Sequence, residues 1–133
     1  AQSALWLHKH SSVDDIRLFL RDYFDVLQNQ DLALFDRVFH PQSVLYSAQN
    51  GEVVVRPFAA YREMVQGRAS PQSQNSPRDD HVLMIDLLSP EMAMAKVQLR
   101  LFDNIMVDHL NLMKVDGRWT IMAKHFSRLR SAV

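Results

Sequence analysis

The 133-residue sequence predicts one α+β domain, with helices in the first part of the chain and antiparallel strands in the second. Two observations lead to this prediction. Early segments carry apolar residues at three- and four-residue spacing, which is the period of an amphipathic helix. From residue 80 onward, apolar and polar residues alternate in segments separated by short turn sequences. Helices followed by a run of strands are typical of α+β domains.

The first helix is expected to begin at Ser12, a good N-cap residue that has Asp15 three positions on, as in a capping box. Its apolar stripe consists of Val13, Ile16, Leu20, Tyr23 and Leu27. The helix is expected to end near residues 28–30. Residues 1–11 then form a loose N-terminal arm, and residues 12–130 form the single domain. The sequence leaves open whether Trp6 docks on that domain or belongs to a linker remnant.

A short second helix is expected to follow Asp31, which is a suitable N-cap residue. Its apolar positions are Leu32, Phe35, Val38 and Phe39. The pair His40-Pro41 should end it, because a residue that precedes proline is pushed out of the α region. We therefore interpret His40 as part of a helix cap in preference to a catalytic residue.

A hairpin is predicted around Asn50-Gly51, because both residues tolerate the positive φ that a two-residue turn requires. Its strands are expected at residues 44–47 and 53–56. Pro57 suits the first turn of a third helix. The apolar side of that helix is expected to carry Phe58, Tyr61, Met64 and Val65.

Residues 67–78 show no periodicity, and a loop of this length is expected to be mobile and to lie at the rim of a pocket. Four strands should follow, at residues 80–88, 92–102, 105–115 and 118–128. Short connections join them, and the Asp116-Gly117 pair is typical of a tight hairpin turn.

The composition excludes several classes of function. Lys and Arg number 15, as do Asp and Glu, and no basic stripe indicates nucleic-acid binding. The chain has no cysteine, which excludes disulfides and thiolate metal sites. The three glycines, Gly51, Gly67 and Gly117, lie too far apart for a dinucleotide fingerprint, and no apolar run approaches the ~18 residues of a membrane span. We expect a cytoplasmic protein, with an exported precursor that has lost its signal peptide as the alternative.

The strand around residue 108 contains the most unusual feature of the chain. Asp108 alternates onto the same strand face as Met106, Leu110 and Leu112, and a carboxylate on an apolar face is costly unless something satisfies or uses it. Tyr23 places a hydroxyl on the apolar stripe of the first helix. If the sheet packs on that helix, both groups enter one space, where they either recognise a ligand oxygen or satisfy each other without a ligand.

The order of these elements resembles the nuclear transport factor 2-like superfamily, over about residues 12–128. The segments Phe39-His-Pro-Gln-Ser-Val-Leu45 and Asp116-Gly-Arg-Trp119 contribute to the resemblance. More narrowly, the chain is similar to the branch known as putative lumazine-binding proteins, close to the polyketide-cyclase-like members. The resemblance implies a cone-shaped roll, in which three N-terminal helices pack on a curved, mainly antiparallel sheet around a pocket. It also implies a homodimer that associates through the sheet.

Ketosteroid isomerases share this fold and use a tyrosine and a protonated aspartic acid as an oxyanion hole. Their pattern of a tyrosine eight residues before an aspartate matches Tyr23 and Asp31, and their acidic hydrogen-bond donor matches Asp108. The resemblance therefore makes Tyr23 and Asp108 the candidate catalytic residues. Their general-base aspartate corresponds to a position near Ser47, and a serine hydroxyl is no base at neutral pH without a partner.

The last strand offers two alternating faces, and the resemblance turns the Lys124 face inward. Lys124 would then pair with Asp108 or with an anionic ligand, whereas Trp119 and His125 would lie outside, where a dimer partner covers them. The expected ligand-binding residues are Tyr46, Ser47, Tyr61, Met64, Met122, Lys124 and Phe126.

Neither a metal nor another cofactor is expected, because the histidines in the domain lack the spacing of known metal motifs. Three functions remain open. The first is binding of an unknown small apolar or carbonyl-bearing molecule. The second is proton-transfer catalysis on a carbonyl compound, as in an isomerase, cyclase or dehydratase. The third is a non-catalytic dimeric interaction module. The absence of an acidic base near Ser47 favours binding over catalysis.

Overall fold

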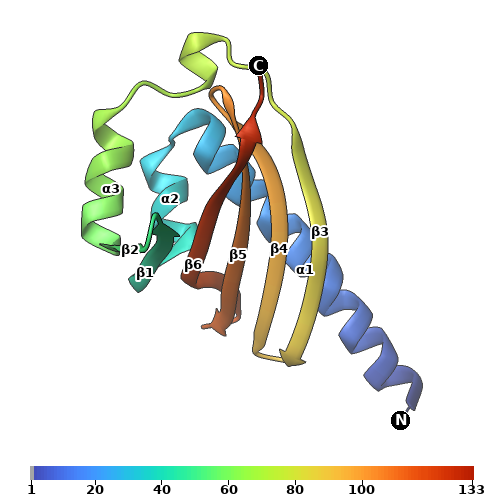
Figure 1. Ribbon diagram of the computed structural model, residues 1–133. Coiled ribbons are helices and arrows are strands. Elements are labelled where there is room, and N and C mark those ends of the chain that lie inside the picture. Colours follow the sequence, from blue (N-terminus) through green and yellow to red (C-terminus); the bar gives the residue numbers. More distant parts are fainter. Residues whose placement is uncertain (1) are drawn as a thin grey trace.

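The computed structural model describes the backbone of residues 2–133 and the side chains of residues 12–133 (Figure 1). In the described residues, two helices are followed by a β-hairpin, a third helix and four further strands, and the six strands form one sheet in the order β2-β1-β6-β5-β4-β3. All neighbouring strands are antiparallel except β1 and β6, which pair in parallel. Figure 1 shows α1 crossing behind β4 and β3, with α2 and α3 beside the β1–β2 hairpin. The predicted α+β class is confirmed.

The first helix, α1, extends over Gln2–Asn29 and is longer than the sequence predicted. It continues through Ser12, so the prediction of an N-cap at that residue was wrong. No glycine or proline interrupts residues 2–12, and extending an existing helix is far easier than nucleating a new one. The suggested docking of Trp6 falls outside the side chains that the structure describes. No helix in the described part of the chain has both the length and the hydropathy that crossing a bilayer requires.

The second helix, α2, spans Leu32–Val38 and begins as predicted. The Asp31 carboxylate accepts hydrogen bonds from the backbone N–H groups of Ala33 and Leu34, at 3.0 and 3.2 Å. The helix ends two residues before the predicted His40-Pro41 stop, because Phe39 is already extended and pairs with β6. His40 therefore caps no helix, and its Nδ1 accepts a hydrogen bond from the Gln42 N–H at 3.0 Å.

The hairpin turn lies where it was predicted. Strand β1, Phe39–Gln49, pairs with β2, Glu52–Pro57, and the two turn residues, Asn50 and Gly51, have φ values of 53° and 79°. Such a turn fixes the register, so that Leu45 lies opposite Arg56 and both face the helices. Helix α3, Phe58–Gly67, follows directly, with Pro57 as its N-cap residue.

The C-terminal half is the predicted four-strand meander. Its strands are β3 (Asp80–Ser89), β4 (Met92–Leu101), β5 (Asn104–Val115) and β6 (Arg118–Ser131). The register between β5 and β6 shifts once: Leu112 pairs with Ile121, whereas Asn111 pairs with Ala123. Met122 is the extra residue of this β-bulge, and the alternation of inward and outward side chains changes phase there.

The connection from α3 to β3 contains a short 3₁₀ helix, η1 (Gln72–Gln74), and closes over the upper end of the molecule in Figure 1. Two contacts tie it to α1. The Gln28 side-chain amide donates a hydrogen bond to the Ser76 carbonyl at 3.3 Å, and Arg78 forms an ion pair with Asp25 at 2.7 Å. The mobility of this loop stays a prediction.

The hydrophobic core fills the space between the helices and the inner face of the sheet. Helix α1 contributes its apolar stripe, and β4 contributes the alternating residues that the sequence predicted. Both Asp108 and Lys124 point into this apolar layer and are about 2% and 5% exposed. Buried charges of this kind require a partner, which makes their surroundings the natural place to look for a site.

Candidate functional site

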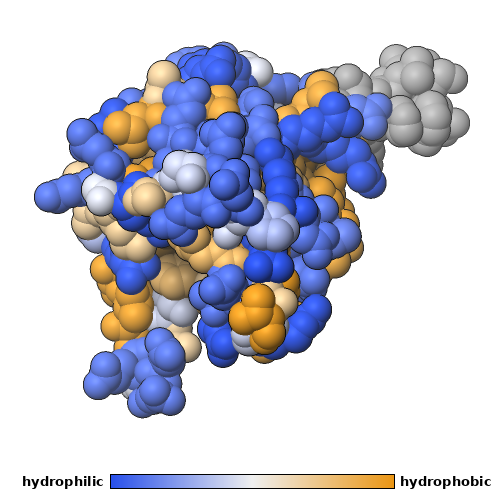
Figure 2. All heavy atoms as spheres, turned by 90° about the horizontal axis from the view of Figure 1, so that it is seen from above, coloured by the Kyte–Doolittle hydropathy of each residue, from blue (hydrophilic) through white to orange (hydrophobic). Residues whose placement is uncertain are grey.

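A cavity of about 290 Å³ lies between the helices and the inner sheet face, near the end of the molecule where α3 ends and β4 turns into β5. Its size is close to the lower limit of typical ligand pockets, which is about 300 Å³. Its walls are mainly apolar. They are formed by Leu27, Leu45, Arg56, Tyr61, Met64, Arg68, Leu99, Leu101, Phe102, Asn104, Met106, Asp108, Lys124 and Phe126. Figure 2, which views the molecule from this end, shows hydrophobic surface between mostly hydrophilic side chains.

Tyr23 and Asp108 meet at the inner end of this cavity. The Tyr23 hydroxyl donates a hydrogen bond to Asp108 Oδ2 at 2.7 Å, across 85 positions of sequence. Helix α1 supplies the tyrosine from its buried stripe, and β5 supplies the aspartate from its inner face. Asp108 lines the cavity, whereas Tyr23 lies behind it with no exposed surface.

Lys124 completes a buried polar group with these two residues. Its Nζ lies 3.8 Å from Asp108 Oδ2, and the two side chains are only 7% and 2% exposed. The same ammonium lies over two aromatic rings, 5.1 Å from the centre of Tyr23 and 5.4 Å from that of Tyr61. The aromatic faces and the carboxylate together offset the loss of hydration of the lysine.

The electrostatics of this group keep the tyrosine protonated. Burial raises the pKa of Tyr23 well above its ordinary value, and the negative charge of Asp108 raises this pKa further. The neutral hydroxyl therefore stays a hydrogen-bond donor to Asp108. The second carboxylate oxygen, Asp108 Oδ1, is buried and has no hydrogen-bond partner within the described part of the chain.

Two arginines contribute further positive charge to the cavity lining. Arg56 of β2 lies over the Phe126 ring at 5.4 Å, and Arg68, just after α3, lies over the Phe102 ring at 5.9 Å. When the Gln30 amide is oriented to satisfy its neighbours, its oxygen accepts a hydrogen bond from Arg68 Nε at 2.9 Å. Arg68 Nη2 is buried and has no partner among the described residues.

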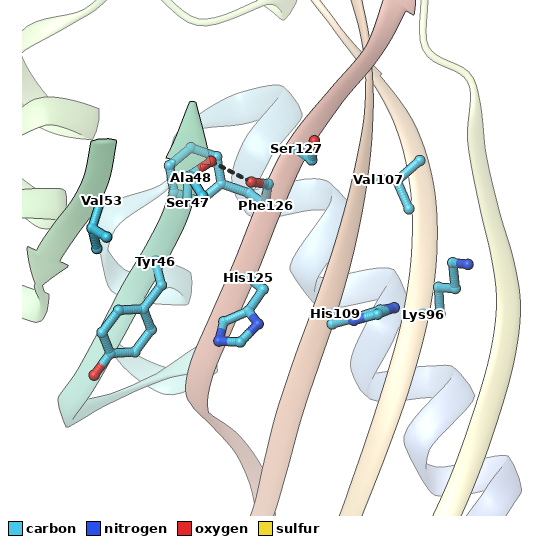
Figure 3. A pocket seen from close by; sticks show the side chains of 10 residues that line it. All are labelled: Tyr46, Ser47, Ala48, Val53, Lys96, Val107, His109, His125, Phe126 and Ser127. Carbon is cyan, nitrogen blue, oxygen red and sulfur yellow. Dashed lines mark hydrogen bonds between the residues drawn. The ribbon is translucent and has the colours of Figure 1, made fainter. Parts of the chain in front are cut away.

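A second depression, about 500 Å³ in volume, crosses the outer face of the sheet (Figure 3). A row of side chains runs across it from Tyr46 on β1 through His125 and His109 to Lys96 on β4, as the strand registers require. The Tyr46 and His125 rings meet edge to face, with centres 5.6 Å apart. Phe126 lines both places, but Tyr46, His125 and His109 alternate with the inward residues of their strands, so the outer groove lies on the opposite face of the sheet from the cavity.

The structure divides the predicted ligand-binding residues between these two places. Tyr61, Met64, Lys124 and Phe126 line the cavity with Asp108. Tyr46 and Ser47 line the outer groove, where Phe126 also contributes. The Ser47 hydroxyl donates a hydrogen bond to the Phe126 carbonyl at 2.6 Å, drawn as a dashed line in Figure 3.

Two residues of the last strand lie elsewhere than expected, because the bulge at Met122 was not visible in the sequence. Met122 lines a separate depression near Asp86 and Leu88. Trp119, expected on the outer face, is 5% exposed and belongs to the core. His125, beyond the bulge, does face outward.

Sequence reasoning missed the two cavity arginines. A signal for Arg56 was present, because a two-residue turn at Asn50-Gly51 places Arg56 opposite Leu45, on the inner face. No comparable signal exists for Arg68, which follows the end of α3 and is held by Gln30 from a distant segment. In the described residues, no group of three or more histidine, aspartate or glutamate side chains is arranged to hold a metal ion.

Three helices packed on a six-strand, mostly antiparallel sheet around an internal cavity define a nuclear transport factor 2-like protein. The chain belongs to the putative lumazine-binding family, whose model matches residues 11–127. The resemblance found in the sequence is thereby confirmed. No relative is found among proteins of curated function.

Solved structures with this fold are similar over almost the whole chain. A nuclear transport factor 2-like protein of unknown function from Silicibacter pomeroyi has a TM-score of 0.79 at 15% identity, covering 90% of this chain and 98% of that one. One from Shewanella baltica has a TM-score of 0.74 at 18% identity, covering 92% and 94%. A ketosteroid isomerase-like protein from Erwinia carotovora atroseptica has a TM-score of 0.66 at 11% identity, covering 88% and 95%. Identities this low establish the fold alone.

Proposed function

We propose that this protein binds a small, largely apolar molecule with a polar hydrogen-bonding group in the inner cavity. The observation that carries the proposal is Asp108 Oδ1, a buried acceptor that lines the cavity and has no hydrogen-bond partner among the described residues. A buried acceptor left unsatisfied costs about 1–3 kcal/mol. A donor group of a bound molecule would remove that penalty, whereas the apolar walls would hold the rest of the molecule.

A purely structural role for the polar group is the main competing interpretation. Tyr23 and Lys124 both contact Oδ2 of Asp108, so a structural role accounts for that oxygen. It does not account for Oδ1, nor for the adjoining cavity of about 290 Å³, which apolar side chains would otherwise fill. These two features favour a binding site.

Binding is better supported than catalysis. Proton abstraction from a carbonyl compound requires a base in addition to the groups that stabilise the developing oxyanion. Asp108 is the one acidic residue among those that line the cavity, and it already accepts the Tyr23 hydroxyl. The Ser47 hydroxyl donates a hydrogen bond to the Phe126 carbonyl and lies on the outer groove, so Ser47 offers no substitute base.

The proposal is tested with cinnamamide, an uncharged molecule with a planar apolar body and an amide that can donate to Asp108. We expect it to perturb amide signals of cavity residues such as Leu101 and Met106 in a ¹⁵N NMR titration. Asp108→Ala should abolish these shifts at a temperature at which circular dichroism shows this variant to be folded. The matched control is His109→Ala, which alters the neighbouring side chain on the opposite sheet face. Shifts confined to the outer groove, or shifts unchanged in Asp108→Ala, would refute the proposal.

We further propose that a second copy of the chain covers the outer groove. Exposed apolar residues support this, since Tyr46, Val53 and Val55 share this face and are 37%, 73% and 55% exposed. An apolar surface on a sheet face commonly marks a contact with another protein. A homodimer of this kind is compatible with ligand binding, because the cavity lies on the opposite side of the sheet.

A further inference from the structure

The charges around the cavity do not balance. Three basic side chains, Arg56, Arg68 and Lys124, line it together with one carboxylate, Asp108. Lys124 and Asp108 lie within ion-pair distance of each other, so their charges offset one another. No described acidic side chain forms an ion pair with Arg56 or Arg68 in this structure. The cavity therefore carries an excess of positive charge that arises from two guanidinium groups.

Arg68 is held in place as a donor. The side-chain oxygen of Gln30 accepts a hydrogen bond from Arg68 Nε, and the Phe102 ring lies beneath the guanidinium group of Arg68. Its Nη2 is nevertheless buried without an acceptor among the described residues, although hydrogen-bonding atoms of buried guanidinium groups normally have partners. An oriented and unsatisfied N–H group at a cavity wall is suited to receive an anionic oxygen.

Arg56 lines the same cavity. It comes from β2, faces inward opposite Leu45, and lies over the Phe126 ring. Both arginines are only partly buried, whereas Asp108 and Lys124 are almost fully buried. Arg56 lies level with Lys124, because Leu45 pairs with both, whereas Arg68 lies beside Phe102 at the turn from β4 to β5.

We infer that the ligand of this cavity is an organic monoanion, a carboxylate on a planar apolar body, with the carboxylate held by Arg68 and with Arg56 adding positive charge to the same cavity. This inference rests on the proposed binding function and specifies its ligand class. A guanidinium group offers parallel N–H donors that match the two oxygens of a carboxylate. A hydrogen-bond donor at the remote end of such a molecule would reach Asp108 Oδ1, and the apolar body would lie against Leu99 and Met106.

The test compares cinnamate with cinnamamide, which have the same shape and differ in charge. Binding of both to the full chain is measured by ¹⁵N NMR titration at neutral pH. The wild-type protein is expected to bind cinnamate about 10- to 100-fold more tightly than the amide, the range given by a hydrogen bond to a charged group. Arg68→Gln should remove most of that preference and Arg56→Gln a smaller part of it, and both should leave cinnamamide affinity within about threefold. Arg130→Gln, on the exposed end of β6, is the control.

The outcomes separate this inference from the proposed function. Equal affinity of the wild-type protein for both molecules, with shifts at the cavity, would refute the anion preference and leave the binding function supported. Cavity shifts from neither molecule would refute both. An undiminished preference for cinnamate in Arg68→Gln and Arg56→Gln would also overturn the inference. If circular dichroism shows that Arg68→Gln does not fold, the anion preference is still tested by the wild-type comparison and by Arg56→Gln.

Discussion

Replacing Asp108 by alanine should destabilise the protein strongly, because two buried groups depend on this carboxylate. Lys124 Nζ lies 3.8 Å from Oδ2, and at an effective dielectric constant of about 20 this separation corresponds to an attraction of roughly 4 kcal/mol. The Tyr23 hydroxyl would also lose its acceptor, at a cost of about 1–3 kcal/mol. Removing the unsatisfied Oδ1 offsets part of this loss. We therefore expect a net loss of about 3–5 kcal/mol.

The assay is urea unfolding at neutral pH with a thermal melt alongside, where the expected loss corresponds to a Tm lower by about 10–20 °C. The double variant Asp108→Leu/Lys124→Met removes both charges together. It should recover most of the lost stability, because replacing a buried pair by apolar side chains is often neutral. His109→Ala should change the free energy of unfolding by less than about 0.5 kcal/mol.

A loss of less than about 1 kcal/mol in Asp108→Ala would contradict this expectation. It would mean that Lys124 does not depend on Asp108 and reaches solvent or another partner. A double variant as unstable as the single variant would refute the coupling as well, because interacting residues must show non-additive effects.

Three further predictions concern other parts of the account. The pKa of the Tyr23 hydroxyl is raised in the folded state, so the stability that this hydroxyl contributes is complete below its unfolded pKa of about 10 and is lost as the pH rises above that value. Tyr23→Phe should flatten this decline in a series of thermal melts at increasing pH. The protein should sediment as a dimer at ~10 µM, and His125→Glu, which places a charge in the outer groove, should yield monomers; a monomeric wild-type protein contradicts this. Asp31→Ala should reduce stability by about 1 kcal/mol in urea, because α2 loses both cap hydrogen bonds; an unchanged midpoint contradicts this.

The elements of the fold were predictable from sequence because local signals fixed them. The Asn50-Gly51 and Asp116-Gly117 turns both adopt positive φ, and the four strands after residue 80 lie within a few residues of their predicted bounds. The start of α1 was not predictable, because Ser12 resembles an N-cap equally well inside a continuous helix. Nor was the early start of β1, which depends on pairing with β6 more than 80 positions away.

The site was predictable where it depended on one element at a time. Alternation along β5 placed Asp108 inward, and the helical stripe of α1 did the same for Tyr23. Two features of the site could not be predicted from single elements. The bulge at Met122 reverses the phase of β6, so Trp119 enters the core although His125 faces outward. Arg68 joins the cavity only through tertiary contacts with Gln30 and Phe102.

The most direct test of the binding site is a crystal structure of the protein soaked with cinnamate. We expect density for the molecule inside the cavity lined by Asp108, with its carboxylate within hydrogen-bond distance of Arg68 Nη2. A cavity that holds only water or rearranged side chains, with density for the molecule confined to the outer groove beside His125, would contradict the account.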